Sequence, residues 1–418
     1  MFESTNLELL PMAEEIQEQE VKKEEVETKE LSRNELIDQV IMKLRSDDFT
    51  VHFYCPAMPK PSGGVGVLLR LASHLSKRYK VKVWYEPIHD QQLSMQESNK
   101  AKKRIDIFRL FNYDWIDFDV SKVEFKPLGD KEAVTVDKDG KMVKFETSPL
   151  QVNSEDFLVI PEGFPNVMQM TSQITCKRIV LAQSWAYVLT GMQAGQSWAN
   201  FGIKDVISVS DAITEFINTT MGGMKIKKIR QGIDRDIFKI PEKKSFKKPM
   251  IAYMTPRGEE TRLKVMNIIK MFQAVNPHYR WVRFVEIGGM NREEFAERLS
   301  EFAFCLYTDE IAGFGTLPLE AMATGTHIIG WFPFGSKEYV SDKNGFWAQN
   351  GEIFQMVELI GVALDKWLSG EMDTDVIQTD YESVLENYTV EGEEDRIIEI
   401  FKEYKTERTR ELEQAKTN

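Results

Sequence analysis

The residues best suited to chemistry lie in a few short stretches rich in glycine and charge. The stretch EIAGFGTLPLEAMATGTHIIG, residues 310–330, places Glu310 and Glu320 on either side of a Gly-Phe-Gly turn, ahead of an apolar strand pattern. An acid near the start of a helix stabilises the helix dipole by under about 1 kcal/mol, and it can also accept hydrogen bonds from a ligand. We therefore interpret the stretch as a candidate binding loop with two candidate carboxylates.

A second glycine-rich stretch is SGGVGVLLRLASHLSK, residues 62–77. Gly63, Gly64 and Gly66 stand where an apolar strand leads into a helix, so their backbone amides can face a phosphate or a sugar without interference from a Cβ atom. Their spacing differs from G-x-G-x-x-G, and the alternative is a plain tight turn.

Cations follow another strand in IAYMTPRGEETRLK, residues 251–264. Arg257 ends the strand, and Arg262 and Lys264 lie one to two helical turns further on. Cations at such a place can stabilise the charge that develops on a leaving diphosphate. The alternative for each of them is a solvated surface side chain.

These stretches need a scaffold of alternating strands and helices. Residues 49–85 read as a strand, a Pro/Gly loop, a helix and a second strand, and a second α/β set begins near residue 250. Between them, VTVDKDGKMVKFE reads as a hairpin around Asp139–Gly140. We expect an α/β fold of two Rossmann-like domains facing a cleft, with ligands at the carboxyl ends of the strands. The expected segments are an acidic arm (1–34), a first domain (35–240), a second domain (241–380) and a C-terminal helix that crosses back (381–418).

Taken together, the stretches resemble the signature of retaining GT-B glycosyltransferases of the family 4 type, over residues of about 49–360. The matching pieces occur in the family's order: SGGVGVLLRLASHLSK, VISVSDAITEFI, IRQGIDRDIF, IAYMTPRGEETRLK, GFGTLPLEAMATGTHIIG and FGSKEYVSDKNGFW. The resemblance implies sugar transfer from a nucleotide-sugar to a glycan or glycoconjugate acceptor. It also implies that the first domain binds the acceptor, that the second binds the donor, and that neither cofactor nor metal is needed.

The resemblance assigns roles residue by residue. Arg257 matches the family's phosphate-binding Arg, and either Arg262 or Lys264 matches its Lys. Glu320, which we expect to begin the helix after the Gly-Phe-Gly turn, matches the acid that accepts hydrogen bonds from the ribose hydroxyls. The backbone amides expected at the sugar or phosphates belong to Gly64, Gly66, Gly313, Phe314, Gly315 and Thr316.

One position departs from the family pattern. The first acid of the two-glutamate motif should stand eight residues before Glu320, where this chain has Ala312. We expect Glu310, or Asp309 beside it, to replace that acid at the donor sugar. The alternative is a chain that binds a nucleotide-sugar without efficient transfer, as a non-catalytic partner of another transferase.

Composition limits the partners. The net charge of −13 disfavours a polyanion, so glycosylation of DNA bases, as in some viral GT-B enzymes, is an alternative that acidity counts against. The stretch QSWAY, residues 183–187, offers Gln183, Trp185 and Tyr187 either to an acceptor sugar or to the core.

Cellular location follows from two further features. Cys55, Cys176 and Cys305 are far apart in the sequence, so we expect reduced, buried thiols. The N-terminus has no basic segment followed by an apolar run, and no stretch approaches the length of a membrane span. We therefore expect a cytoplasmic protein.

Overall fold

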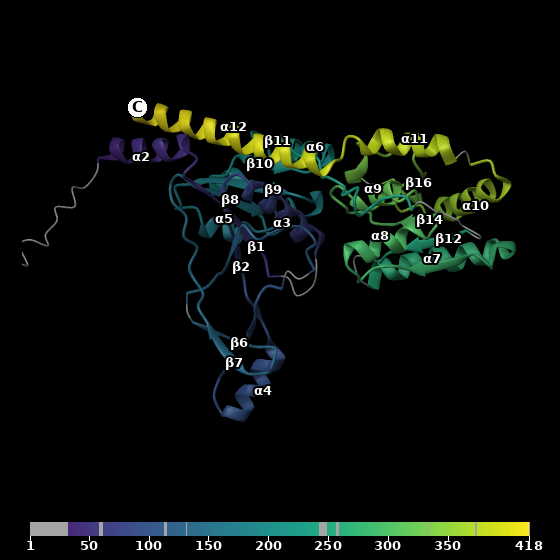
Figure 1. Ribbon diagram of the computed structural model, residues 1–418, viewed down its shortest axis with the longest axis horizontal. Coiled ribbons are helices and arrows are strands. Elements are labelled where there is room, and N and C mark those ends of the chain that lie inside the picture. The colour runs from purple at the N-terminus through teal and green to yellow at the C-terminus, as the bar shows by residue number, and fades with distance from the viewer. Residues whose placement is uncertain are drawn as a thin grey trace, which may run out of the picture.

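The structure is a computed structural model that describes residues 32–57, 62–112, 115–130, 132–241, 249–255, 259–332, 334–372 and 374–417. Two all-parallel sheets with surrounding helices lie side by side along the long axis of the molecule (Figure 1). We call each sheet with its helices the first and the second domain. The predicted α/β fold of two Rossmann-like halves is confirmed.

The first sheet has seven strands in the described residues. Their order is β11 (Lys225–Lys228), β10 (Asp205–Ser208), β9 (Lys177–Ala182), β8 (Phe157–Pro161), β1 (Thr50–Cys55), β2 (Lys80–Tyr85) and β5 (Val123–Pro127). All residues of β8 and β9 are buried, as is typical of parallel strands covered on both faces. β1 pairs with β2 on one side and β8 on the other, so the strand order reverses beside β1, where ligands bind in such sheets.

Helices cover this sheet and position its glycine loop. They are α2 (Arg33–Arg45), α3 (Gly63–Ser76), α5 (Pro165–Met170) and α6 (Asp211–Thr220), with the short 3₁₀ helices η1 (Trp185–Tyr187) and η2 (Trp198–Phe201). Ser32 and Glu35 form a capping box that starts α2. Helix α3 turns an apolar face with Leu68 and Leu71 onto the sheet, which brings its N-terminus to the carboxyl end of β1.

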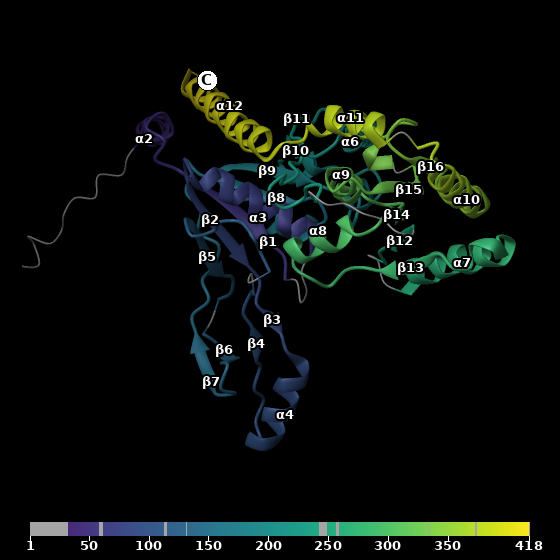
Figure 2. The same ribbon diagram turned by 45° about the vertical axis from the view of Figure 1, so that its right-hand side comes forward.

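A projection extends from the first domain, below the sheet in the view of Figure 2. It contains β3 (Ile88–His89), α4 (Gln91–Ala101), β4 (Phe108–Arg109), β6 (Ala133–Val136) and β7 (Met142–Phe145). The predicted hairpin around Asp139–Gly140 is confirmed, since β6 and β7 pair antiparallel and Gly140 has a φ of 78°.

The second sheet has five parallel strands in the described residues, in the order β13 (Arg283–Glu286), β12 (Met250–Tyr253), β14 (Phe304–Tyr307), β15 (His327–Trp331) and β16 (Phe346–Ala348). Its helices are α7 (Glu259–Val275), α8 (Arg292–Ser300), α9 (Thr316–Ala323) and α10 (Ile353–Ser369), with η3 (Pro277–Tyr279) and η4 (Phe334–Ser336). Helix α10 packs on α7.

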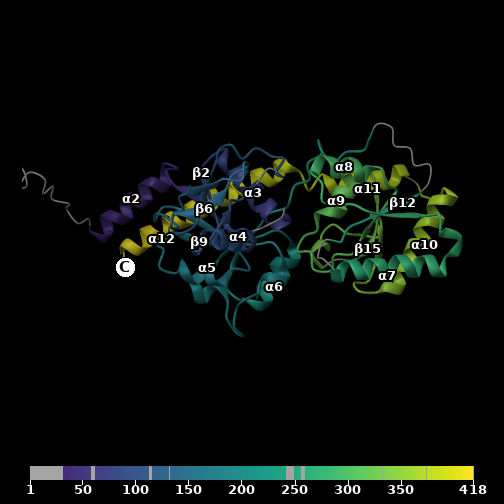
Figure 3. The same ribbon diagram turned by 90° about the horizontal axis from the view of Figure 1, so that it is seen from below.

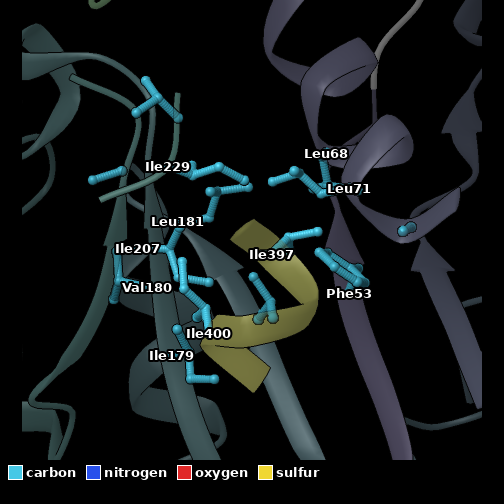
Figure 4. Packing of buried hydrophobic residues seen from close by; sticks show 14 of the residues in the cluster. Phe53, Leu68, Leu71, Ile179, Val180, Leu181, Ile207, Ile229, Ile397 and Ile400 are labelled. Carbon is cyan, nitrogen blue, oxygen red and sulfur yellow. The ribbon is translucent and has the colours of Figure 1, made fainter. Parts of the chain in front are cut away.

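The chain then returns to the first domain. The chain passes from the first domain to the second after β11 and returns after α11 (Thr374–Leu385), and a β-bridge between Ile233 and Thr389 joins these two connecting segments. Helix α12 (Val390–Thr417) then runs back over α3 and α2 (Figure 3). Ile397 and Ile400 of α12 insert between the sheet and α3 (Figure 4). Both side chains belong to the hydrophobic core of the first domain. Full burial of one such side chain contributes about 1.5–3 kcal/mol, so α12 stabilises this domain.

The structure bears on the expectations about the cysteines and about membrane-spanning segments. Cys55, Cys176 and Cys305 are free and buried, as predicted, and burial raises the pKa of each thiol to about 12. Among the helices of the described ranges, none combines the length and apolar character that a membrane span requires.

Candidate active site

A cavity of about 1170 Å³ lies between the two domains. The loops that follow strands of both sheets line it. They contribute Glu162 after β8, Gln183 after β9, Thr255 after β12, Gly288 after β13 and Thr308 after β14. Carboxyl ends of parallel strands therefore face each other across the cavity, which is where α/β sheets bind ligands.

Only part of the first glycine loop faces this cavity. Gly63 and Gly64 line it at the N-terminus of α3, where free backbone amides and the helix dipole favour an anion. Gly66 does not line it, because a Cβ atom there would lie 3.6 Å from the ring of Trp115. We infer that Gly64 is available to a ligand, whereas Gly66 faces the ring of Trp115.

The second glycine loop, residues 312–316, forms the opposite wall. Gly313 lies so close to the first domain that a Cβ atom would stand 1.8 Å from the backbone oxygen of Gln183. Gly315 has a φ of 78° and precedes Thr316, the first residue of α9. A ligand in the cavity therefore meets the amides of a helix start on this side too.

Phe314 belongs to both the cavity and the core. It lines the cavity, but its ring is buried against Tyr339 and Tyr388, with ring centroids 5.4 and 5.6 Å away. The hydroxyl of Ser336 donates to its backbone oxygen at 2.6 Å. These contacts hold the loop from behind.

The expectation that Glu320 begins a helix is wrong. Helix α9 begins four residues earlier, because Gly315 adopts a left-handed conformation and Pro318 lies in the first turn, where a missing N–H costs nothing. Glu320 is partly exposed, and it is not among the described residues that line the cavity. Burial raises its pKa, while Arg292 and a hydrogen bond from Thr316 act in the opposite direction. Thr316, which does line the cavity, thus connects Glu320 to it.

The described candidate cations, Arg262 and Lys264, lie on α7 outside the lining of the cavity. Arg257 lies outside the described residues. Arg262 is exposed. The Lys264 ammonium lies 3.3 Å from Glu310 Oε1 and 3.4 Å from Glu260 Oε1. Partial burial disfavours its charge, but the two carboxylates raise the pKa of Lys264 above its ordinary value.

Ala312, Asp309 and Glu310 differ in their positions relative to the cavity, where an acid was expected at the donor sugar. Ala312 is buried in the cavity wall, at the place where the family pattern has an acid. Asp309 lines the cavity, and its Oδ1 accepts from the backbone N–H of Ile311 at 3.2 Å. Glu310 is turned toward Lys264. Of the two candidates, Asp309 is the one at the cavity in this arrangement.

Glu162 and Glu286 are acids of the cavity that the motifs did not single out. Glu286 accepts a hydrogen bond of 2.6 Å from the hydroxyl of Thr255. Glu162 is buried, and its Oε1 accepts from the backbone N–H of Ser184 at 2.8 Å. Burial raises the pKa of Glu162 to about 7, although backbone donors lower it in part. Its position directly after the apolar run FLVIP was the available sequence signal.

The QSWAY stretch divides between cavity and core. Gln183 and Tyr187 line the cavity. Trp185 does not, because its ring packs on Phe216 and, across the domain junction, on Phe334, with centroids 6.0 and 5.5 Å away. Gln183 and Tyr187 therefore remain candidates for acceptor contacts, and Trp185 joins the domains.

Comparison with known sequences finds one curated relative at a significant level. No protein-family model matches the chain. An alpha-1,6-glucosyltransferase of Actinobacillus pleuropneumoniae serotype 7 is 27 % identical over 230 residues, which are 54 % of this chain and 68 % of that protein.

Comparison with solved structures identifies the fold. The pneumococcal O-GlcNAc transferase GtfA, in complex with UDP and GlcNAc, has a TM-score of 0.57 at 11 % identity, covering 86 % of this chain and 99 % of its own. Anabaena HepE, in complex with UDP-glucose, has a TM-score of 0.55 at 14 % identity, covering 85 % and 99 %. A glycosyltransferase from Rickettsia africae has 0.53 at 13 %, covering 85 % and 98 %. The chain has the GT-B fold, and together the comparisons support a glycosyltransferase.

Proposed function

We propose that this protein transfers a sugar from a nucleotide-sugar donor to a glycan or glycoconjugate acceptor, with retention of the anomeric configuration. The observation that carries the proposal is the interdomain cavity with a helix N-terminus on each wall, at Gly64 and at Thr316. Helix N-termini suit a diphosphate. The cavity volume of about 1170 Å³ exceeds the range of about 300–1,000 Å³ that is usual for one ligand, which leaves room for two substrates.

We assign one substrate to each of the two domains that line the cavity. The second domain holds the donor, with the amides of Gly313, Gly315 and Thr316 at its phosphates and Glu320 at its ribose. For Glu320 this requires a side-chain movement past Thr316, because it does not line the described cavity. The first domain holds the acceptor, with Gln183 and Tyr187 as contacts.

We further propose that cations and helix dipoles stabilise the leaving diphosphate, in place of a cofactor or a metal ion. Arg257 and one of Arg262 and Lys264 are the cations. For Lys264 to act, it has to exchange Glu310 or Glu260 for a phosphate oxygen. A charge-assisted bond to a phosphate is about twice as strong as a neutral one, which favours this exchange when donor binds.

Glucose is the first donor sugar to test, because the curated relative is named a glucosyltransferase and HepE was solved with UDP-glucose. A panel of nucleotide-sugars is screened by thermal shift, where a ligand at 100 times its dissociation constant adds about 2.7 kcal/mol of stability. Donors that stabilise the protein are then tested for turnover. Failure of every nucleotide-sugar to stabilise the protein would overturn the proposal.

Product analysis decides the finer points. The anomeric proton coupling in the NMR spectrum of the product reports retention or inversion. Acceptor arms include neutral oligosaccharides and DNA with hydroxymethylated bases, and transfer to the DNA alone would replace the glycan acceptor by the DNA alternative. The acidic net charge of −13 favours the glycan.

A non-catalytic nucleotide-sugar-binding subunit is the second candidate. Two observations favour it: Ala312 replaces the expected acid, and Glu310 is engaged by Lys264. Such a protein would bind donor in the thermal-shift panel and release no nucleotide diphosphate with any acceptor. Turnover by the purified chain separates it from the enzyme.

A further inference from the structure

Among the described residues that line the cavity, Glu162 is the acid that the first domain contributes. It is 5 % exposed, directly after β8. Its Oε1 accepts from the backbone N–H of Ser184 at 2.8 Å, and the backbone N–H of Gln183 also donates to its carboxylate. Buried backbone donors at the end of a strand need such partners. Glu162 therefore holds the turn 183–184 that follows the neighbouring strand, β9.

This turn contacts the glycine loop of the other domain. The hydroxyl of Ser184 donates to the backbone oxygen of Ile311 at 3.3 Å. The backbone oxygen of Gln183 lies where a Cβ atom on Gly313 would be 1.8 Å away. The approach of Gln183 to Gly313 joins backbone to backbone, so rotation of a side chain cannot absorb a shift there. Displacement of the turn must therefore displace the loop.

The loop has a second support from the first domain. The hydroxyl of Ser210 donates to the backbone oxygen of Gly313 at 2.9 Å. Ser210 is the N-cap of α6, and its hydroxyl also accepts from the backbone N–H of Ile213 at 3.2 Å. Ser210 fixes one side of the loop, and the turn that Glu162 holds fixes the other.

We propose that Glu162 is a positioning residue: through the turn 183–184 it sets the place of the glycine loop 312–316 against which the donor would bind. Its effect on catalysis rests on the proposed function. The link between Glu162 and the loop is a property of the fold and is testable without a substrate.

The first test is amide hydrogen exchange on the full chain. Glu162→Ala removes both acceptor oxygens, whereas Glu162→Gln keeps one oxygen that can accept from Ser184. We expect Glu162→Ala to speed exchange several-fold in peptides covering 311–316, relative to peptides of β15 as an internal standard, and Glu162→Gln to restore most of the protection. Unchanged exchange at 311–316 in Glu162→Ala would overturn the proposal.

Asp156→Ala is the matched control. Asp156 precedes β8 at its other end, is equally buried, and accepts from the backbone N–H groups of Thr50 at 2.7 Å and Asn153 at 2.8 Å. Its loss should destabilise the protein near residues 50 and 153 and leave 311–316 at the rate of the internal standard. Equal loosening of 311–316 by both variants would show a general structural role and refute the positioning role.

Ser184→Ala provides a second variant in case Glu162→Ala fails to fold. It removes the hydroxyl bond to Ile311 and keeps the backbone bond to Glu162. We expect faster exchange at 311–316 with normal protection of β9. Normal exchange there would mean that the turn does not hold the loop, which also overturns the proposal.

The activity arm is run with a donor that the wild type turns over. Glu162→Ala should lower kcat by up to about 100-fold, as expected for a misplacement of about 1 Å, with Glu162→Gln in between and Asp156→Ala near the wild type. Wild-type kcat in Glu162→Ala would contradict the role in catalysis. If the wild type turns over no donor, the proposed function fails, and the exchange experiment still decides the link.

Discussion

Replacement of Gly313 by alanine is the sharpest test of the interdomain contact. The new Cβ atom would lie 1.8 Å from the backbone oxygen of Gln183 and 2.7 Å from the Cα atom of Ser184. Ordinary van der Waals contact begins at 3.4 Å, so loop and turn must separate by about 1.6 Å. Both partners are backbone, and Glu162 holds the turn from behind. We therefore expect the loop 312–316 to move.

The expected cost has two parts. Overpacking of this kind destabilises by about 1–3 kcal/mol, and each kcal/mol lowers the melting temperature by about 2–4 °C in a domain of 150–250 residues. A loop displaced by more than 1 Å should lower kcat/KM by about 100-fold. Thermal unfolding, calorimetry of nucleoside diphosphate binding and steady-state kinetics measure these effects.

Gly361→Ala is the control for this prediction. Gly361 lies inside α10, and the nearest atom to an added Cβ is the Asn276 side-chain oxygen at 4.0 Å. Alanine there should be neutral or stabilising by up to about 1 kcal/mol, with unchanged kinetics. If Gly313→Ala behaves like this control in both assays, loop and turn are not in contact in the working protein, and the reasoning fails.

Three further changes test individual residues. Arg257→Ala should remove about 2–4 kcal/mol of transition-state stabilisation and so lower kcat, while the circular dichroism spectrum stays unchanged. A normal kcat would exclude the phosphate-binding role. Asp309→Asn should raise the donor KM and lower kcat, because Asp309 is the one of the two candidate acids that lines the described cavity, whereas Glu310→Gln should change unfolding by under about 1 kcal/mol because its pair with Lys264 is partly exposed; unchanged kinetics in Asp309→Asn would exclude it from the donor site. The pKa of Glu162, about 7 against 4.5 ordinarily, means that the folded state binds this proton more tightly, so stability should fall as pH rises from 4.5 to 7, by up to about 3 kcal/mol. Urea unfolding of Glu162→Gln should show a flatter pH dependence over that range, and parallel curves would contradict the assignment.

The fold could be predicted because its signals are local. The strand FLVIP and the IVLA part of β9 appear as continuous apolar runs, and the Asp139–Gly140 pair predicts its hairpin from turn chemistry. Alternation of such strands with helical periods predicts two doubly wound sheets. The start of α9 was mispredicted because a left-handed Gly315 and a first-turn proline together outweigh the position of the acid.

The sequence by itself determined the class of fold, the two glycine-rich loops and the kind of ligand expected between them, since strand period, turn residues and helix starts are written in neighbouring residues. The tertiary structure alone decided which side chains reach the cavity. It pairs Glu310 with Lys264, 46 residues away in the chain, directs Gly66 to Trp115, and brings Glu162 against the turn that supports Gly313. Such pairings depend on how two separately folded sheets meet, and no local pattern encodes the register of that contact.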